Sequence, residues 1–494
     1  MSTINLFFDV TNLSIPSIVF LILVIPLITY FLVVWLHTNY KFRMFKGPTI
    51  VPVLGNLYTL KALTFITFLV DLRRKYGKVF TLSTFTKTFI VVCDPIIVRR
   101  ILIDTKTFPK DEIYTYYFNY TFGDGLVTSI GEKHKKDRVL FGKYFIRSNI
   151  IKFTEQMNAT TDLAITEFAG KFGEGVVNIE DFFATLAIRV FITYLTSKDY
   201  FAGDRATETK LCHMVSKGSY FVAVCIYLGI PMWKIFPVVN QLNQSVEFIF
   251  AVCMAALKER REILARGEGA EIDDLLSVMI RENMSDKDCC DHFITLLSAG
   301  HDTTAYFASY TCFLLAENPE AQEKLYEEIK AVTGDSETVT ADHFASMKYM
   351  QKVMQETLRL YAVIPTLSRC ATEDVHIPEA KMTIPKGTAL LLPLYLINRD
   401  PELWPNPSKF DPERFEGSGN DFTSARSGFF PFGFGTRTCI GNTLAQIESS
   451  VFLVKLLRKY RIEPDVGFRP RIAAGISLTT ENGINVRLVK RETM

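Results

Sequence analysis

The sequence has almost no excess of charge of either sign: 494 residues hold 55 Lys and Arg against 53 Asp and Glu, a formal net charge of +2. A chain this close to neutrality has no general attraction to nucleic acid, so we exclude nucleic acid as a partner. Nine cysteines lie at irregular spacings without a C-x-x-C pair, which excludes a regular zinc or disulfide framework and suits a reducing compartment. A G-x-G-x-x-G nucleotide-binding unit is also absent. The hydrophobic content of 48% is enough to bury a large core.

Charged side chains are also missing from residues 15–36. These 22 residues are enough to cross the ~30 Å of hydrocarbon in a bilayer as a helix. Lys41, Arg43 and Lys46 follow, whereas no Lys or Arg precedes, so the positive-inside rule places the large domain in the cytoplasm. A cleaved signal peptide is the alternative, but the apolar run is long and no basic region precedes it. We expect a lumenal segment at 1–14, a transmembrane anchor at 15–36, a basic, proline-rich hinge at 37–56 and one large domain at 57–494.

Three segments of the first 125 residues carry local structural signals. Residues 78–92 are rich in β-branched and aromatic side chains with partial alternation, which indicates a hairpin. Asp94 followed by Pro95 is typical of a helix start, and we expect this helix to run through Leu102. Residues 114–122 carry six aromatic side chains. They form either aromatic core or a loop that lines an apolar pocket.

One cysteine stands in a loop suited to close contact with a ligand. Residues 431–441 place Cys439 two positions after Arg437 and include glycines at 433, 435 and 441. Glycines let the backbone take positive φ and approach a flat ligand. A thiolate here needs amide donors, a cation, a helix N-terminus or a metal, and Arg437 and the following apolar helix supply two of these. The alternative is a buried free cysteine in a glycine-rich turn.

The spacing F-x-x-G-x-R-x-C-x-G of this loop resembles that of the cytochrome P-450 family of haem-thiolate monooxygenases. The resemblance implies that Cys439 is the axial ligand of the iron in haem b, where its electron donation favours O–O cleavage. It also implies that Phe432 packs beside the sulfur, that Arg437 pairs with a haem propionate, and that Gly433 and Gly441 lie against the cofactor. The fold implied is the cytochrome P-450 fold, mainly α with a minor β region, behind a single N-terminal transmembrane helix.

A long apolar helix predicted over residues 293–315 contains the polar insertion Gly-His-Asp-Thr-Thr at 300–304. Burying Asp302 without partners would cost several kcal/mol, so an ion pair, a water-filled kink or a function must account for it. The insertion fits the oxygen-binding pattern of the same family at every position. By that resemblance Thr303 hydrogen-bonds iron-bound dioxygen and relays protons to it with Asp302, while Gly300 leaves room for oxygen over the ring.

The resemblance also assigns side chains to the haem propionates and to the substrate pocket. In a basic helix expected over 131–145, Arg138 matches the arginine of a family W-x-x-x-R pair, and His134 stands in place of the tryptophan. Arg369 is expected to meet the second propionate. The lysines of the basic helix form either a solvated face or a docking surface for an acidic electron donor. The expected pocket residues are Tyr116, Phe118, Phe293, Leu297, Ala299, Val363, Ile364, Leu367 and Ile476.

A charge network is predicted behind the cysteine loop. Glu356 and Arg359 form an i, i+3 pair on one predicted helix face, a motif that is usually exposed and contributes little. The later segment at 410–415 resembles the family's P-E-R-F segment. The resemblance implies that Glu356, Arg359 and Arg414 form a buried network whose role is structural.

The activity implied by the resemblance is insertion of one oxygen atom from O₂ into a lipophilic substrate such as a sterol, fatty acid, terpenoid or xenobiotic. Electrons would come from NADPH through NADPH-cytochrome P-450 reductase, with cytochrome b5 as an additional donor, at the endoplasmic reticulum membrane. Two alternatives remain open: a haem-thiolate isomerase or lyase that consumes a peroxide without a reductase, and a non-catalytic haem-binding protein. The acid–alcohol pair of Asp302 and Thr303 favours oxygen activation, because peroxide rearrangement needs no proton relay.

Overall fold

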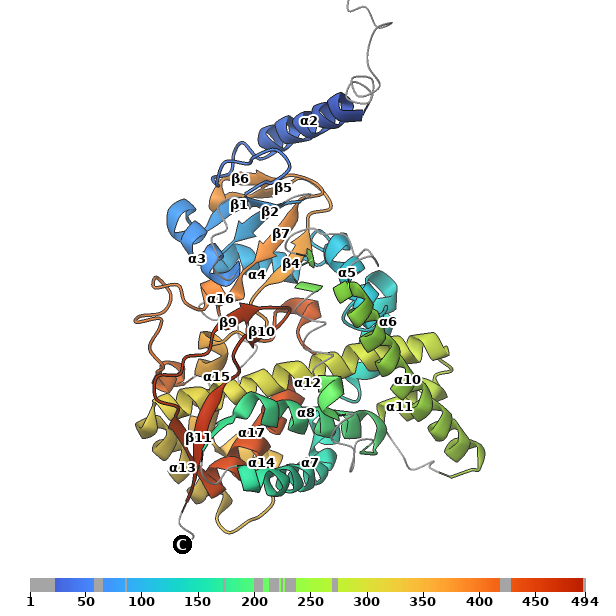
Figure 1. Cartoon of the computed structure of the whole chain (residues 1–494), viewed down its shortest axis with the longest axis vertical. Helices are drawn as coiled ribbons and strands as arrows, with labels where there is room; N and C mark the ends of the chain where they lie inside the picture. Colours follow the sequence, from blue (N-terminus) through green and yellow to red (C-terminus); the bar gives the residue numbers. More distant parts are fainter. Residues whose placement is uncertain are drawn as a thin grey trace, which may run out of the picture.

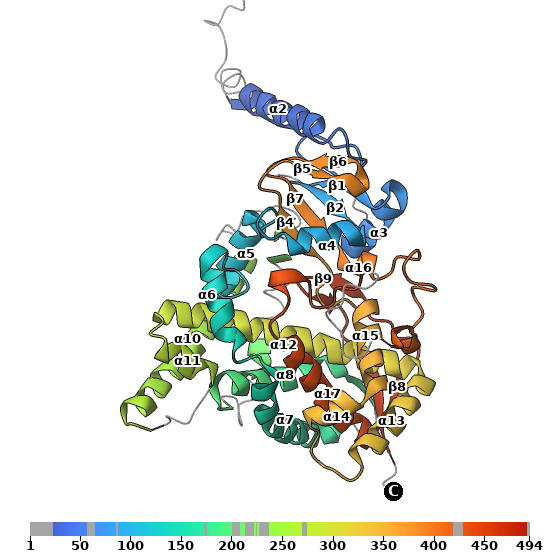
Figure 2. The same ribbon diagram turned by 180° about the vertical axis from the view of Figure 1, so that it is seen from behind.

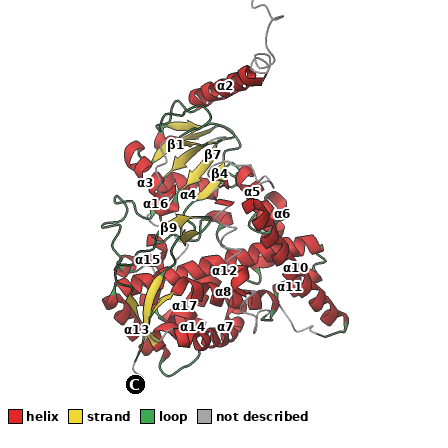
Figure 3. Ribbon diagram, in the orientation of Figure 1, coloured by secondary structure: helices red, strands yellow, loops and turns green. Residues whose placement is uncertain are grey.

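Most of the helices and the largest sheet lie at opposite ends of the molecule, as Figure 3 shows. The structure is a computed structural model that describes residues 23–56, 65–84, 87–171, 175–199, 208–212, 222–223, 225–226, 237–268, 274–417 and 428–491. The expected architecture, mainly α with a minor β region, is confirmed.

The helix α12, Asp286–Glu317, crosses the molecule and several other helices pack against it (Figure 1). Its start is fixed by Ser285, whose hydroxyl accepts a hydrogen bond from the N–H of Asp288 at 3.1 Å. The middle of α12 is buried on nearly all sides, and α8, Ile179–Thr196, packs along it. The helix predicted over 293–315 is therefore confirmed, and it begins about two turns earlier than expected.

The remaining helices lie around α12 or at the sheet end, where α2 projects beyond the strands (Figure 2). Helix α17 packs against α7 and α12, and α15 packs against α12 and the 3₁₀ helix η6. The α-helices are α2 (Ile25–Lys41), α3 (Phe65–Tyr76), α4 (Pro95–Ile103), α5 (Glu112–Phe122), α6 (Gly131–Gly142), α7 (Arg147–Phe168), α10 (Pro237–Ala265), α11 (Leu275–Arg281), α13 (Pro319–Thr333), α14 (Ala341–Ser346), α15 (Lys348–Leu360), α16 (Leu394–Ile397) and α17 (Asn442–Lys459). The 3₁₀ helices are η4 (Ala169–Lys171), η5 (Pro378–Ala380), η6 (Pro412–Phe415) and η8 (Gly435–Arg437).

Strands from distant parts of the chain form the largest sheet, in the order β1-β2-β7-β4. The antiparallel strands β1 (Val79–Ser83) and β2 (Thr88–Val92) confirm the hairpin predicted over 78–92. Strand β2 pairs in parallel with β7 (Ala389–Leu392), with Phe89 opposite Ala389. Strand β7 then pairs antiparallel with β4 (Leu367–Cys370).

Three smaller sheets complete the strand content of the described residues. One has the order β3-β11-β8, and the others are the antiparallel pairs β9-β10 and β5-β6. Their strands are β3 (Val176–Asn178), β5 (Val375–Ile377), β6 (Met382–Ile384), β8 (Tyr460–Pro464), β9 (Ile472–Ala474), β10 (Leu478–Thr480) and β11 (Asn485–Lys490).

The helix predicted from the Asp94-Pro95 pair is confirmed as α4. The carboxylate of Asp94 accepts hydrogen bonds from the N–H groups of Ile96 at 3.0 Å and Ile97 at 3.2 Å, which caps the helix. The basic helix expected over 131–145 is confirmed as α6, which ends at Gly142. The loop considered for 114–122 is wrong, because these residues form α5, whose inner side joins the core.

The N-terminal part of the predicted anchor lies outside the described residues, and most of the rest forms about the first two-thirds of α2. Several large apolar side chains of α2 are exposed, among them Leu27, Ile28 and Val33. No helix in the part of the chain that the structure describes combines the length and the apolarity that crossing a bilayer requires. The hinge after α2 is fixed to the sheet, since the N–H of Thr81 donates to the carbonyl of Lys46 at 2.8 Å.

Candidate active site

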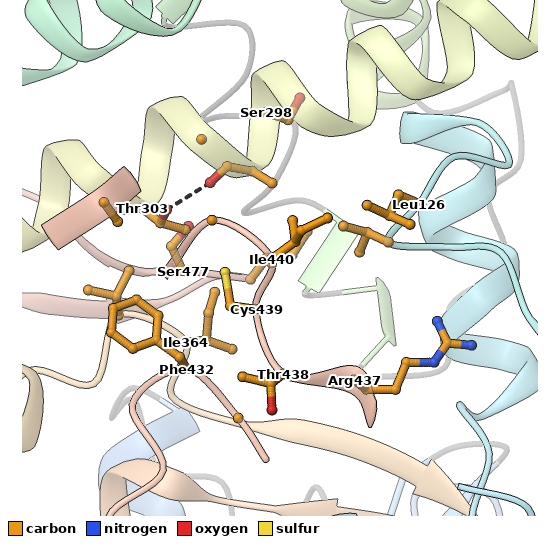
Figure 4. A pocket seen from close by; sticks show the side chains of 18 of the residues that line it. Leu126, Ser298, Thr303, Ile364, Phe432, Arg437, Thr438, Cys439, Ile440 and Ser477 are labelled. Atoms are coloured by element: carbon orange, nitrogen blue, oxygen red, sulfur yellow. Dashed lines mark hydrogen bonds between the residues drawn. The ribbon is translucent and has the colours of Figure 1, made fainter. Parts of the chain in front are cut away.

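A cavity of about 330 Å³ lies between α12, α6, β4 and the loop that carries Cys439. Its walls are mainly apolar, with polar groups gathered in a few places. Figure 4 shows the sulfur of Cys439 pointing toward the helix that carries Ser298 and Thr303. The cysteine and the polar stretch of α12, which the sequence singled out separately, therefore face one cavity.

The cysteine loop, residues 431–441, is supported by its own backbone and by α4. The N–H of Cys439 donates to the carbonyl of Phe432 at 2.9 Å, which folds the loop back on itself. Gly435 has a φ of +75°, and a Cβ there would lie 2.7 Å from the carbonyl oxygen of Leu102. Only glycine fits this close approach, so the loop is seated firmly against the end of α4.

Cys439 is exposed to the cavity, and the protein around the cavity encloses its thiol. Burial raises the pKa of the Cys439 thiol, while the N–H of Gly441 and the charge of Arg138 lower it in part. The protein alone therefore does not favour the thiolate, which a bound metal cation would stabilise. Among the described residues, no group of three or more His, Cys, Asp or Glu is placed to hold a metal ion. A single sulfur facing an open cavity instead fits a metal that arrives within a flat cofactor, as haem iron does.

Four basic side chains line the cavity: Lys110, Arg138, Arg369 and Arg437. Arg437 donates to the carbonyl of Ser129 at 3.0 Å and Arg369 to that of Ser368 at 2.8 Å. Within the described ranges no carboxylate forms a salt bridge with any of the four. Uncompensated buried cations are costly, so this wall fits a doubly anionic group such as the two propionates of haem.

The positive charges of these side chains lower the pKa values of their neighbours. Burial, together with the charges of Arg369 and Arg138, lowers the pKa of Arg437 to about 10. Burial, followed by Arg437, Lys110 and Arg138, lowers the pKa of the nearby His134 to about 4. His134 is therefore neutral at pH 7 and has one ring N–H to donate. Lys110 was not predicted from the sequence, because it is not part of a motif. Only its position beside the arginines in the folded chain identifies it.

The acid and the alcohol of α12 have different surroundings. Asp302 is 4% exposed and accepts a hydrogen bond from the hydroxyl of Ser477, in the turn between β9 and β10. Thr303 lines the cavity and donates to the carbonyl of Ala299 at 2.7 Å. The buried acid is thus satisfied by a partner 175 positions away in the sequence.

Gly300 lies where α12 packs against α8. A Cβ at this position would lie 2.1 Å from the ring of Phe191 on α8. Phe191 fills the space that a side chain at position 300 would need, while the backbone of Gly300 lines the cavity, so the room for oxygen expected there stays a prediction. Phe191 itself lines the cavity, so this contact sets the shape of one wall.

Replacing Gly300 with alanine is expected to destabilise the protein by about 1–3 kcal/mol, because the new methyl group displaces Phe191 in a packed interface. Chemical denaturation of the haem-bound protein measures the change. Gly142→Ala is the matched control, since nothing lies within 4 Å of a Cβ there and alanine favours the end of a helix. Equal stability of the two variants would contradict the packing role of Gly300.

Most of the residues expected in the substrate pocket line the cavity, and three do not. Those at the cavity are Phe118, Ala299, Val363, Ile364, Leu367 and Ile476. Tyr116 is 55% exposed, and Phe293 and Leu297 are fully buried in the core away from the cavity. Residues two apart on a helix point about 200° apart, so Leu297 faces away from the side that carries Ala299. The same rotation separates Tyr116 from Phe118 on α5.

A second acid that the sequence analysis missed also borders the cavity. Glu448 of α17 is 1% exposed, and its Oε1 has no hydrogen-bond partner in the structure. Burial raises the pKa of Glu448 well above its usual value, although a hydrogen bond from Thr304 opposes this. Burial therefore favours the protonated, neutral form of Glu448 over its carboxylate.

The predicted charge network behind the loop is assembled in the structure. The carboxylate of Glu356 accepts from Arg359 at 2.6 and 2.7 Å and from Arg414 at 3.3 Å. The side chains of Glu356 and Arg359 are both 0% exposed. Arg359 also donates to the carbonyls of three residues in the segment before η6, namely Asn398, Pro407 and Lys409. The network therefore fixes α15 to the chain that leads toward the cysteine loop.

Comparisons with known proteins agree with this site. A family model described as Cytochrome P450 matches residues 45–486. Cytochrome P450 3A13 of Mus musculus is 25% identical over 94% of this chain and 96% of its own length. Probable cytochrome P450 4s3 of Drosophila melanogaster is 27% identical over 91% of this chain and 92% of its own. A taurochenodeoxycholic 6 alpha-hydroxylase of Sus scrofa is 36% identical over 44% of this chain and 43% of its own.

Proposed function

We propose, from the premise that this chain belongs to the cytochrome P450 family, that it oxidises a lipophilic small molecule with electrons from a separate reductase. Membership of the family makes the chain a haem-thiolate enzyme, and monooxygenation is the activity that the family implies. One observation carries the proposal further. A single cavity joins the thiol of Cys439, four basic side chains that form no salt bridge with a described carboxylate, and the acid–alcohol pair of α12.

The residues at one side of the cavity would hold the haem. Cys439 would bind the iron through its sulfur, with Phe432, Gly433 and Gly441 beside it. When bound, the haem supplies the activation of dioxygen. The residues that would bind the propionates by charge or by an N–H group are Lys110, His134, Arg138, Arg369 and Arg437.

The polar stretch of α12 would deliver protons at the opposite side. Thr303 presents its hydroxyl to the cavity, where it can accept or donate a hydrogen bond by rotation about χ1. Asp302, held by Ser477, is adjacent to it on the helix and can pass on a proton. The two side chains thus suit a relay that ends at the Thr303 hydroxyl.

The apolar walls favour a lipophilic substrate. Phe118, Val363, Ile364, Leu367 and Ile476 remove apolar ligand surface from water, which stabilises binding by roughly 25 cal/mol per Å². Sterols, fatty acids, terpenoids and xenobiotics share this chemistry. The name of the porcine relative, a taurochenodeoxycholic 6 alpha-hydroxylase, supports hydroxylation as the reaction.

The surface features support a membrane-bound enzyme with a protein electron donor. The exposed apolar side chains of α2 suit the end of a membrane anchor at residues 15–36. Residues 1–14 would then lie in the lumen of the endoplasmic reticulum. A hinge at 37–56 would connect the anchor to a catalytic domain that begins at residue 57. Lys135, Lys136 and Lys143 at α6 are exposed and suit an acidic partner such as NADPH-cytochrome P450 reductase, with cytochrome b5 as an additional donor.

Purified full-length protein with reductase, NADPH and dioxygen is expected to consume NADPH and form a hydroxylated product from at least one sterol, fatty acid or terpenoid. A low-spin to high-spin shift in the haem spectrum would first select the ligands from a panel. Conversion of a lipid peroxide without NADPH would instead favour the isomerase or lyase. Bound haem with neither reaction would favour a carrier, and either result would contradict the proposal.

A further inference from the structure

We propose that Glu180, in the first turn of α8, is the group that collects protons from solvent and supplies them to Asp302. This inference rests on the proposed monooxygenase function. Glu180 lies outside the cavity and would act through Asp302, so it is a proton-supplying residue and not one that touches the substrate.

The need for such a group follows from the burial of Asp302. An acid that gives up a proton in each cycle must regain one from water, yet Asp302 is only 4% exposed. Its hydroxyl partner, Ser477, is 2% exposed, and both residues face the cavity and not the outer surface. An apolar substrate that fills the cavity displaces water from this side, so during turnover the proton reaches Asp302 through a neighbouring group.

A short hairpin and one turn of α12 hold Glu180 close to Asp302. In the β9-β10 hairpin, Ser477 donates to Asp302 and Thr480 donates to Glu180 at 2.6 Å. On α12, Tyr306 follows Asp302 by one turn on the same face, and its hydroxyl is hydrogen-bonded to Glu180. The two carboxyl groups are thus tied to the same two elements.

The charge of Asp302 acts on at least four titratable groups among the described residues: Glu180, Cys212, Tyr306 and Tyr310. Burial raises the pKa values of the cysteine and of both tyrosines far above neutrality, so these groups keep their protons. Of these four groups, only Glu180 can gain and lose a proton at physiological pH.

The environment of Glu180 suits this exchange. Glu180 is partly exposed, so water reaches it. Burial, with the charges of Asp181 and Asp302, raises its pKa to about 7, although hydrogen bonds from Thr480 and Tyr306 oppose the rise. A donor with a pKa near the working pH is well matched to proton transfer.

The transfer moves one proton and no electrons. The carboxylate of Glu180 takes a proton from water. In the proposed transfer the hydroxyl of Tyr306, which is hydrogen-bonded to Glu180, turns to Asp302 one helical turn away, gives it a proton and takes the proton of Glu180 in exchange, so Tyr306 is never ionised. Glu180 is then ionised again and ready for the next cycle.

The test compares Glu180→Gln, which cannot release a proton, with the control Asp181→Asn. Asp181 is exposed and lies in the same first turn of α8, so both variants remove one charge at the same helix end. In the resting haem-bound protein, infrared difference spectroscopy is expected to show a carboxylic acid band that titrates with a midpoint of about 7. This band should vanish in Glu180→Gln and persist in Asp181→Asn, without any turnover.

In turnover with reductase and NADPH, Glu180→Gln is expected to lower product formation at pH 7 about 10²-fold, the low end for a positioned proton donor. The wild-type rate should fall as pH rises through about 7, because Glu180 then loses its proton, and this inflection should be absent in Glu180→Gln. Glu180→Asp should recover part of the rate, and Asp181→Asn all of it.

The outcomes separate this inference from the proposed function. An inert wild-type enzyme would overturn the monooxygenase itself. An active wild type with an equally active Glu180→Gln would overturn the role of Glu180, as would equal losses in Glu180→Gln and Asp181→Asn. Unchanged haem content and an unchanged unfolding midpoint in Glu180→Gln would exclude misfolding as the cause of a lower rate.

Discussion

Replacement of Cys439 by serine is expected to abolish thiolate ligation of the haem and to reduce monooxygenase turnover below detection. Serine is nearly isosteric, so the loop retains its hydrogen bond from residue 439 to Phe432. Its hydroxyl does not ionise in this buried position, however, and it lacks the electron donation that favours O–O cleavage. The measurement is the spectrum of the reduced, carbon-monoxide-treated protein, in which the Soret band near ~450 nm should disappear.

A second cysteine provides the control for this substitution. Cys370 of β4 is partly exposed and does not line the cavity. Cys370→Ser should keep both the Soret band and the turnover of the wild type. Retention of haem, band and turnover by Cys439→Ser would contradict the assignment of the iron ligand.

Replacement of Glu356 by alanine is expected to destabilise the protein by about 3–5 kcal/mol, the cost of leaving a buried charge without its partner. Arg359 would lose its two bonds to Glu356, at 2.6 and 2.7 Å, and would remain fully buried. The N–H of Asp411 would lose its acceptor as well. Urea unfolding of the haem-bound protein measures the loss, and the Soret band of the folded fraction reports damage to the cysteine loop.

An exposed ion pair provides the comparison. Glu327 and Lys330 lie 3.5 Å apart on α13 with exposed side chains, so Glu327→Ala should cost about 0.5 kcal/mol or less. An exposed pair contributes at most about 1 kcal/mol. If the free energies of unfolding of Glu356→Ala and Glu327→Ala differ by less than this, the buried network is disproved.

The sequence was informative wherever the signal is local. Asp94 and Pro95 mark a helix start because the cap and the first turn are neighbours in the chain. The cysteine loop is equally local, since its glycines, Arg437 and Cys439 lie within eleven residues. The long, strongly apolar helix α12 is likewise predictable from composition and length.

The orientation of helices about their own axes was not predictable in the same way. Phe293 and Leu297 belong to the expected helix, but the packing of α12 on α8 turns them into the core. For 114–122, aromatic residues on both sides of the helix hide its period, so α5 could not be distinguished from a loop. Tyr116 faces outward because α5 is a helix.

Pairings across long sequence distances were also beyond a single sequence. Nothing near Asp302 announces Ser477, and nothing near Glu180 announces Thr480, 300 positions later. Lys110 is not part of any sequence motif. It lies beside the arginines of the cavity only because the chain folds back there after the preceding helix. Such contacts arise only when the chain is folded.

The pairing of β2 with β7 joins Phe89 to Ala389, so the sheet next to the hinge needs residues 300 positions apart. During translation, the first hairpin therefore leaves the ribosome long before the strand that completes its sheet. If the N-terminus is already inserted in the bilayer, the nascent chain stays tethered beside the membrane with an open β edge for most of its synthesis. An unpaired strand edge of this kind invites chaperone binding, which we expect to end only when β7 emerges.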